Sequence, residues 1–199
     1  GLVGEDGPTH SGNYDIAYLR CIPNMVICTP SDENETRKLL TTAYLHNGPA
    51  SVRYPRGTGP NSKVDKDLKP LSIGEANIIN EESSEIVILN FGTLLEEANK
   101  ISKELKATLV DMRFVKPLDE KLLKKLLKKA EVFISIEDGS IMGGAGSAVQ
   151  EFVSNENLKV RSILFGIPDR FIEHASREEM LIEAGLDIKS IKSKLNKLL

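Results

Sequence analysis

The stretch "MVICTPSDENETRKLLTTAYLHNGPASVRYP", residues 25–55, decides the fold class. It begins with a short apolar strand and ends with a second one, "ASVRYP". The helix between them has Ser31 as its expected N-cap, Asp32 and Glu33 in its first turn, and Gly48 beyond its end. A strand, a helix and a strand with short connections form a βαβ unit, so the sequence predicts a parallel sheet.

The regions on either side extend this organisation. Upstream, "DIAYLRCI" predicts a short helix. Downstream, "GTGPNSKVDKDLKP", residues 57–70, has almost nothing to bury and predicts a linker. We therefore expect a first unit over residues 1–60, a linker over 61–70 and a second unit over 71–199.

The second unit alternates strands with helices. "EANIIN" and "EIVILN" are expected strands that form a hairpin about "EESS". Then follow a helix over 93–106, the strand "ATLVD", the helix "DEKLLKKLLKKA", the strand "EVFISI", the helix "GGAGSAVQEFVSN" and the strand "VRSILF". Ser176 and Glu179 predict a capping box, and Asp187 begins a last helix. The fold class is α/β, with a mostly parallel sheet and helices on its faces.

Composition narrows the class of protein. The 40% hydrophobic and 28% charged residues are ordinary for a globular protein, and a net charge of -3 does not favour a nucleic-acid or membrane-surface partner. No apolar run approaches the ~20 residues of a membrane span. Cys21 and Cys28 are expected to be buried, reduced thiols, which fits a reducing compartment. The opening Gly-Leu-Val-Gly is typical of a strand entering a turn, so we expect the chain to start inside a longer protein.

Two motifs have both a functional and a structural interpretation. A basic amphipathic helix such as "DEKLLKKLLKKA" can bind membranes or calmodulin, but within a βαβ pattern one face is expected on the sheet and one in water. "MGGAGSAV", residues 142–149, resembles a dinucleotide loop but lacks the third glycine, and Ser147 is not in a G-x-S-x-G elbow. Tight packing of helix against strand is the favoured interpretation.

The loop "GEDGPTHSGNYD", residues 4–15, is a candidate site. Its glycines allow the backbone to approach a ligand, His10 can exchange protons near neutral pH, and Asp6 can orient the imidazole or bind a substrate. From the residues alone, a surface turn with a solvated histidine is an equal alternative. His46 and His174 are assigned structural roles, and no cluster has metal-ligand spacing.

A second candidate is "VRYPRG", residues 52–57, at the end of a strand. Ligands of parallel sheets bind outside the carboxyl ends of the strands, and arginine binds phosphate with two hydrogen bonds. Arg53 and Arg56 are therefore candidates, with a pair of surface arginines as the alternative.

Five stretches in order, with matching gaps, carry a family resemblance: "GEDGPTHSGNYDIAYLRCIPNMVICTPSDENE", "VRYPRG", "RFVKPLDE", "GGAGSAV" and "GIPDRFIEHASREEM". Together they resemble the 1-deoxy-D-xylulose-5-phosphate synthases, thiamine-diphosphate enzymes of the transketolase superfamily. "GEDGPTH" alone would also fit a transketolase. The resemblance covers essentially the whole chain as the C-terminal third of such an enzyme. Residues 1–60 correspond to the C-terminal half of the pyrimidine-binding domain, and 71–199 to the transketolase C-terminal domain.

The resemblance implies a decarboxylating transferase. It condenses pyruvate with glyceraldehyde 3-phosphate to 1-deoxy-D-xylulose 5-phosphate and CO₂, for isoprenoid, thiamine and pyridoxal biosynthesis. It implies a cytoplasmic homodimer, with a plastid-type organelle left open, and no nucleic-acid or membrane partner. The cofactors, thiamine diphosphate and Mg²⁺, are expected to be bound mainly by residues absent from this chain. The 199 residues alone are therefore expected to be inactive.

The resemblance also assigns roles to individual residues. His10 is implied to be catalytic, hydrogen-bonding or passing protons to the substrate oxygens, and Asp6 is implied to contact the substrate in the same pocket. Arg56 is implied to anchor the acceptor phosphate, while Arg53, facing the other way along an alternating strand, is a weaker candidate. The alternatives are a transketolase, a dehydrogenase β-subunit-like thiamine enzyme, or a non-catalytic dimerisation or packing module.

Overall fold

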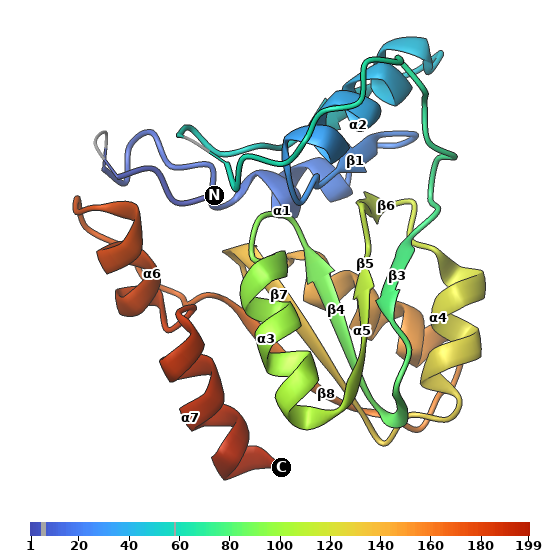
Figure 1. Cartoon of the computed structure of the whole chain (residues 1–199), viewed down its shortest axis with the longest axis vertical. Coiled ribbons are helices and arrows are strands. Elements are labelled where there is room, and N and C mark those ends of the chain that lie inside the picture. The colour runs from blue at the N-terminus through green and yellow to red at the C-terminus, as the bar shows by residue number, and fades with distance from the viewer. Residues whose placement is uncertain (5–6, 58) are drawn as a thin grey trace.

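The chain forms two sheets, which lie one above the other in Figure 1. The computed structural model describes residues 1–4, 7–57 and 59–199. The first sheet has the strand order β2-β1-β6, formed by β1 (Val26–Cys28), β2 (Ala50–Val52) and β6 (Phe114–Lys116). β1 and β2 are parallel and are connected by α2 (Glu33–Leu45), so the predicted βαβ unit is confirmed.

The second sheet has the order β3-β5-β4-β7-β8. Its strands are β3 (Asn77–Asn80), β4 (Ser83–Phe91), β5 (Ala107–Asp111), β7 (Val132–Ser140) and β8 (Arg161–Ile167). All neighbours are parallel except β3, which runs antiparallel to β5 at the edge. The mostly parallel α/β fold class is therefore confirmed.

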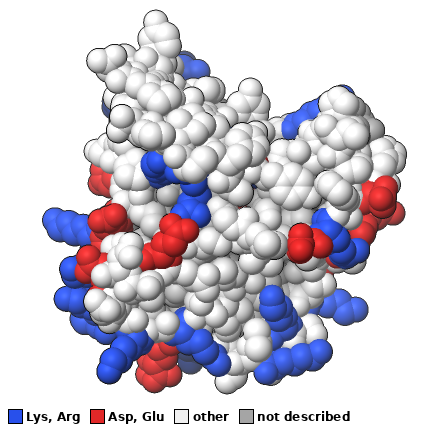
Figure 2. Space-filling view, turned by 180° about the vertical axis from the view of Figure 1, so that it is seen from behind, with Lys and Arg blue, Asp and Glu red and all other residues white. Residues whose placement is uncertain are grey.

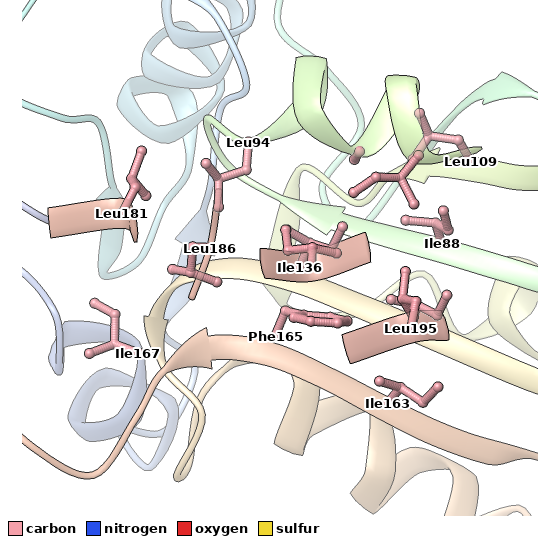
Figure 3. Close-up of a cluster of buried hydrophobic side chains, with 14 of the residues drawn as sticks. Ile88, Leu94, Leu109, Ile136, Ile163, Phe165, Ile167, Leu181, Leu186 and Leu195 are labelled. Atoms are coloured by element: carbon pink, nitrogen blue, oxygen red, sulfur yellow. The ribbon is translucent and has the colours of Figure 1, made fainter. Parts of the chain in front are cut away.

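Helices cover both faces of the second sheet. The remaining helices are α1 (Asp15–Arg20), α3 (Leu95–Leu105), α4 (Glu120–Leu127), α5 (Ala145–Asn155), α6 (Arg177–Ala184) and α7 (Ile188–Leu198). Successive strand residues point to opposite faces, so Ile88 and Ile134 pack toward α3, α6 and α7, whereas Val87 and Phe133 pack toward α1, α4 and α5. Figure 3 shows the first of these cores, with Leu195 of α7 among Phe165 and other sheet side chains.

The two motifs with alternative interpretations are structural. Leu123 and Leu127 of α4 are buried against the sheet, and Figure 2 shows basic side chains along the edge of the molecule on which α4 lies. At the start of α5, a Cβ on Gly144 would lie 2.1 Å from the Ser140 carbonyl oxygen, so helix and strand pack too closely for a side chain. Among the residues that the structure describes, no helix combines the length and apolar character needed to cross a membrane.

Three local predictions are wrong. β3 and β4 are not paired as a hairpin, because β5 lies between them and pairs with both. The N-cap of α2 is Asp32, whose carboxylate accepts the Glu35 amide at 2.8 Å, rather than Ser31. Cys28 is buried as expected, but Cys21 is exposed because it follows the last turn of the short helix α1.

The first and second units are joined by more than the linker. β6 comes from the second unit but pairs antiparallel with β1 of the first. Arg113 donates to both carboxylate oxygens of Glu35, at 2.7 and 3.0 Å. The Ser31 hydroxyl donates to the buried Asp111 carboxylate at 2.7 Å. The linker has neither helix nor strand in its described part and runs beside α2, where Arg37 donates to the Lys66 carbonyl at 3.0 Å.

Asp111 makes this junction sensitive to pH. Burial raises the pKa of the Asp111 carboxyl to about 7, with Glu35 acting in the same direction and the Ser31 hydrogen bond and Arg113 opposing it. The folded chain therefore retains a proton that the unfolded chain releases near pH 4. The corresponding stability is fully present below pH ~4 and is lost as the pH rises through about 7.

We expect Asp111→Asn to flatten this pH dependence. In the native protein, Asp111 contributes a fall in unfolding free energy of up to about 1.4 kcal/mol per pH unit between pH ~4 and 7. The variant keeps an oxygen that can accept the Ser31 hydroxyl but cannot ionise. Urea unfolding of the purified protein over that pH range measures the slope. The control is Asp67→Asn at an exposed linker carboxyl, and an unchanged slope in Asp111→Asn would contradict the assignment.

Candidate functional site

A cavity of about 660 Å³ lies where the carboxyl ends of the parallel strands meet. Its wall includes Ser31 and Asp32 after β1, Arg56 after β2, Thr93 after β4, and Arg177 at the start of α6. This is the end of a parallel α/β sheet at which ligands generally bind. The structure thus places one of the predicted site residues, Arg56, in the wall of a cavity.

The cavity wall carries charges of both signs. Arg56 is exposed, whereas the Arg177 side chain is 35% exposed and donates to the Thr93 hydroxyl at 2.9 Å. Glu96 and Glu97, in the first turn of α3, lie on the same wall. The guanidinium groups supply donors suited to a phosphate or carboxylate, and the acids can bind hydroxyl groups of a polar substrate.

His10 lies on the opening loop rather than among the residues that line this cavity. The imidazole is exposed, and its Nδ1 lies 2.9 Å from the Thr9 hydroxyl. The His10 amide donates to the Gly7 carbonyl at 3.2 Å, which closes a tight turn. His174, assigned a structural role, lies beside this turn, because a Cβ on Gly7 would be 3.6 Å from the His174 Cβ. Asp6 lies outside the described residues.

Arg53, the weaker candidate, is in a buried ion-pair network instead of at the surface. Only 6% of its side chain is exposed. Its Nε donates to both carboxylate oxygens of Asp15, at 2.9 and 2.7 Å, and its Nη1 donates to the Asp138 carboxylate. Its Nη2 donates to the carbonyls of Gly12 and Asp138, at 2.8 and 3.1 Å. Removing one partner of such a buried pair typically costs ~3–5 kcal/mol.

The network keeps the Asp138 carboxylate ionised. Burial alone would raise the pKa of Asp138, but the charge and hydrogen bond of Arg53, together with the charges of the Gly1 amino group and Arg177, outweigh burial and hold that pKa well below its usual range. Burial alone would lower the pKa of Arg53, but Asp138 and Asp15 raise it above its ordinary value. The pair is therefore a fixed pair of charges at neutral pH.

Sequence reasoning missed the partners of Arg53. Asp15 is 38 positions away and Asp138 is 85 positions away, so no local spacing connects them. One signal was available: Glu137 and Asp138 follow the run "VFISI", residues 132–136, and two acids on a wholly buried strand need partners.

Two observations on the described residues bear on thiamine diphosphate and Mg²⁺. Among these residues, no three acidic, histidine or cysteine side chains gather as a metal would require. The glycine-rich start of α5 is a helix N-terminus of the kind that binds diphosphates, but the buried Glu137 carboxylate accepts the amides of Ala145 and Gly146 there, each at 2.8 Å. Burial raises the pKa of Glu137 to about 7, against these two hydrogen bonds and Arg53.

Two family models match the chain. The transketolase pyrimidine-binding domain matches residues 1–61, and the transketolase C-terminal domain matches residues 74–191.

Curated relatives agree with these models. A 1-deoxy-D-xylulose-5-phosphate synthase of Pseudomonas aeruginosa (strain LESB58) is 55% identical over 96% of the chain, and one of Pseudomonas fluorescens (strain Pf0-1) is 54% identical over 94%. The chain spans 30% and 29% of the lengths of these two relatives.

Solved structures share the fold. A split-gene transketolase, described as an inactive β4 tetramer, is 26% identical with a TM-score of 0.85, over 96% of this chain and 63% of that one. A transketolase from Campylobacter jejuni has a TM-score of 0.70 at 23% identity, over 98% of this chain and 29% of that one. The chain therefore belongs to the transketolase family, and within it resembles the C-terminal part of the 1-deoxy-D-xylulose-5-phosphate synthases.

Proposed function

We propose that these 199 residues act as the C-terminal part of a synthase that condenses pyruvate with glyceraldehyde 3-phosphate to 1-deoxy-D-xylulose 5-phosphate and CO₂. The observation that carries the proposal is the 55% identity along 96% of the chain to proteins of that name. The proposed protein is a cytoplasmic homodimer that uses thiamine diphosphate and Mg²⁺. We propose that residues outside this chain hold both for the most part, which is supported by Glu137 accepting the amides at the start of α5 and by the lack of a three-residue metal cluster among the described residues.

Within this proposal, the chain supplies substrate contacts. Arg56, exposed on the cavity wall, binds the phosphate of the acceptor with its guanidinium. His10 hydrogen-bonds or exchanges protons with oxygens at the reacting carbon, and its exposed imidazole is accessible for that role. Asp6 remains a proposed substrate contact in the same pocket as His10.

A transketolase is the second candidate, favoured by the TM-score of 0.85 to the split-gene transketolase. The identities favour the synthase, at 55% against 26%. Assay of the full-length protein with both cofactors separates the two. We expect CO₂ release and product formation from pyruvate and glyceraldehyde 3-phosphate. Turnover only with a ketose phosphate donor would establish the transketolase instead.

Arg56→Ala in the full-length protein is expected to raise the KM for glyceraldehyde 3-phosphate about 10- to 100-fold. A hydrogen-bonded arginine–phosphate contact contributes about 1.5–3 kcal/mol, and this contact is distant from the reacting aldehyde. The KM for pyruvate should barely change, because pyruvate has no phosphate. Steady-state kinetics with each substrate varied in turn provide the measurement.

The control for this variant is Arg161→Ala, which removes another exposed arginine, at the start of β8 and outside the cavity. It should leave both KM values unchanged. An unaltered acceptor KM in Arg56→Ala would show that the phosphate assignment is wrong.

A further inference from the structure

Arg53 connects two stretches of the chain, residues 12–15 and Asp138, that are far apart in the sequence. Its guanidinium binds Asp15 at the start of α1, the Gly12 carbonyl in the opening loop, and both the carboxylate and the carbonyl of Asp138 in β7. Asp15 and Asp138 use the Nε edge and Nη1, so Nη2 is directed to the backbone carbonyls. A planar guanidinium can satisfy all of these acceptors together, and an ammonium cannot.

The Gly12 contact lies two residues from His10. At the next position, the Asn13 carbonyl accepts the Ser140 amide of β7 at 2.7 Å, and Asn13 is itself buried. The loop is therefore fixed to the second sheet immediately after His10. Because the imidazole is exposed and its hydrogen bond is to the hydroxyl of the adjacent Thr9, its position depends on where this backbone is held.

The Asp138 carboxylate also contacts residues of the cavity wall that includes Arg56. Asp138 Oδ2 accepts the Thr93 hydroxyl at 3.4 Å, and Arg177 Nη2 lies 4.0 Å from Asp138 Oδ2. Thr93 and Arg177 both line the cavity. Asp138 thus contacts Arg53, which binds the Gly12 carbonyl of the His10 loop, and it also contacts Thr93 and Arg177 of the cavity wall.

We propose that the Arg53–Asp138 pair is the positioning element of the proposed active site. Through this pair, the second unit fixes the His10 loop at a set position relative to the cavity whose wall includes Arg56. The inference rests on the proposed function. It gives the second unit a part in the reaction although Arg53 and Asp138 touch no substrate.

The first test is Arg53→Lys in the full-length protein, which keeps the positive charge but loses the planar set of N–H donors of the guanidinium. We expect kcat to fall about 10- to 100-fold, as for a catalytic group displaced by ~1 Å, with the KM for glyceraldehyde 3-phosphate changed less than about threefold. The matched control is Arg113→Lys, because Arg113 makes two hydrogen bonds to Glu35 between the same two units, at the β1–β6 side of the molecule and not at the opening loop. Its kcat should stay within about twofold of wild type.

A double-mutant cycle separates positioning from general damage. If Arg53 acts through His10, Arg53→Lys should cost less than about threefold in a His10→Ala background. Losses that multiply in full would overturn the proposal. Hydrogen exchange of the peptide covering residues 7–14 should be faster in Arg53→Lys and unchanged in Arg113→Lys, and equal exchange in all three proteins would also overturn it.

A variant that keeps the shape of the site guards against misfolding. If Arg53→Lys does not fold, Asp138→Asn takes its place in the same comparisons, since it has nearly the same shape and keeps one acceptor oxygen, while it loses the charge and the second acceptor. A folded wild-type protein that fails to condense the two substrates would contradict the proposed function. The exchange comparison would still decide whether Arg53 holds the loop.

Discussion

His10→Ala in the full-length protein is expected to lower kcat about 10²–10⁴-fold with both substrates saturating. The reason is its proposed place at the oxygens of the reacting carbon, where a proton is held or moved in the transition state. The contact between Nδ1 and the Thr9 hydroxyl occupies one ring nitrogen, so Nε2 of the exposed ring is the atom that we expect to face the substrate.

The control for this variant is His46→Ala, at the C-cap of α2, which removes a half-buried imidazole outside the proposed site. It should leave kcat within about twofold of wild type. A His10→Ala protein with normal kcat would return the loop to an ordinary surface turn.

The 199-residue chain alone is expected to give no measurable product and not to bind thiamine diphosphate tightly in the presence of Mg²⁺. The start of α5 is filled by the chain's own Glu137, and the described residues have no acidic cluster for a metal. Calorimetric titration of the purified chain, shown to be folded by a cooperative thermal transition, measures the binding. The full-length protein is the positive control. Micromolar affinity of the isolated chain would contradict the expectation.

The sequence predicted the helices and strands better than it predicted which strands pair in the sheets. Residues 25–55 carry their strand, helix and strand signals locally, and the parallel pair of β1 and β2 is present. The hairpin of β3 and β4 was wrong because nothing in "EESS" reveals that β5 enters between them. β6 escaped notice because three residues, Phe114–Lys116, are too short to show a period.

The candidate site shows the same division. Arg56 lies on a cavity at the carboxyl ends of the strands, where a general rule for parallel sheets places ligands. The predicted N-cap, Ser31, instead donates its hydroxyl to the distant Asp111, and Asp32 caps α2. Arg53 has its partners on α1 and β7, and only tertiary structure brings those carboxylates together.

β6 has a consequence for how this protein can be divided and recombined. By sequence it belongs to the second unit, yet it completes the sheet of the first. A cut in the linker would leave β1 with an open edge on one product and β6 without its partner strand on the other. Open strand edges can pair with other chains. We therefore expect gene fission, or the exchange of segments between relatives, to preserve the fold only where β1, β2 and β6 stay in the same product. The segment that has to stay together therefore runs from β1 to β6 and includes the linker.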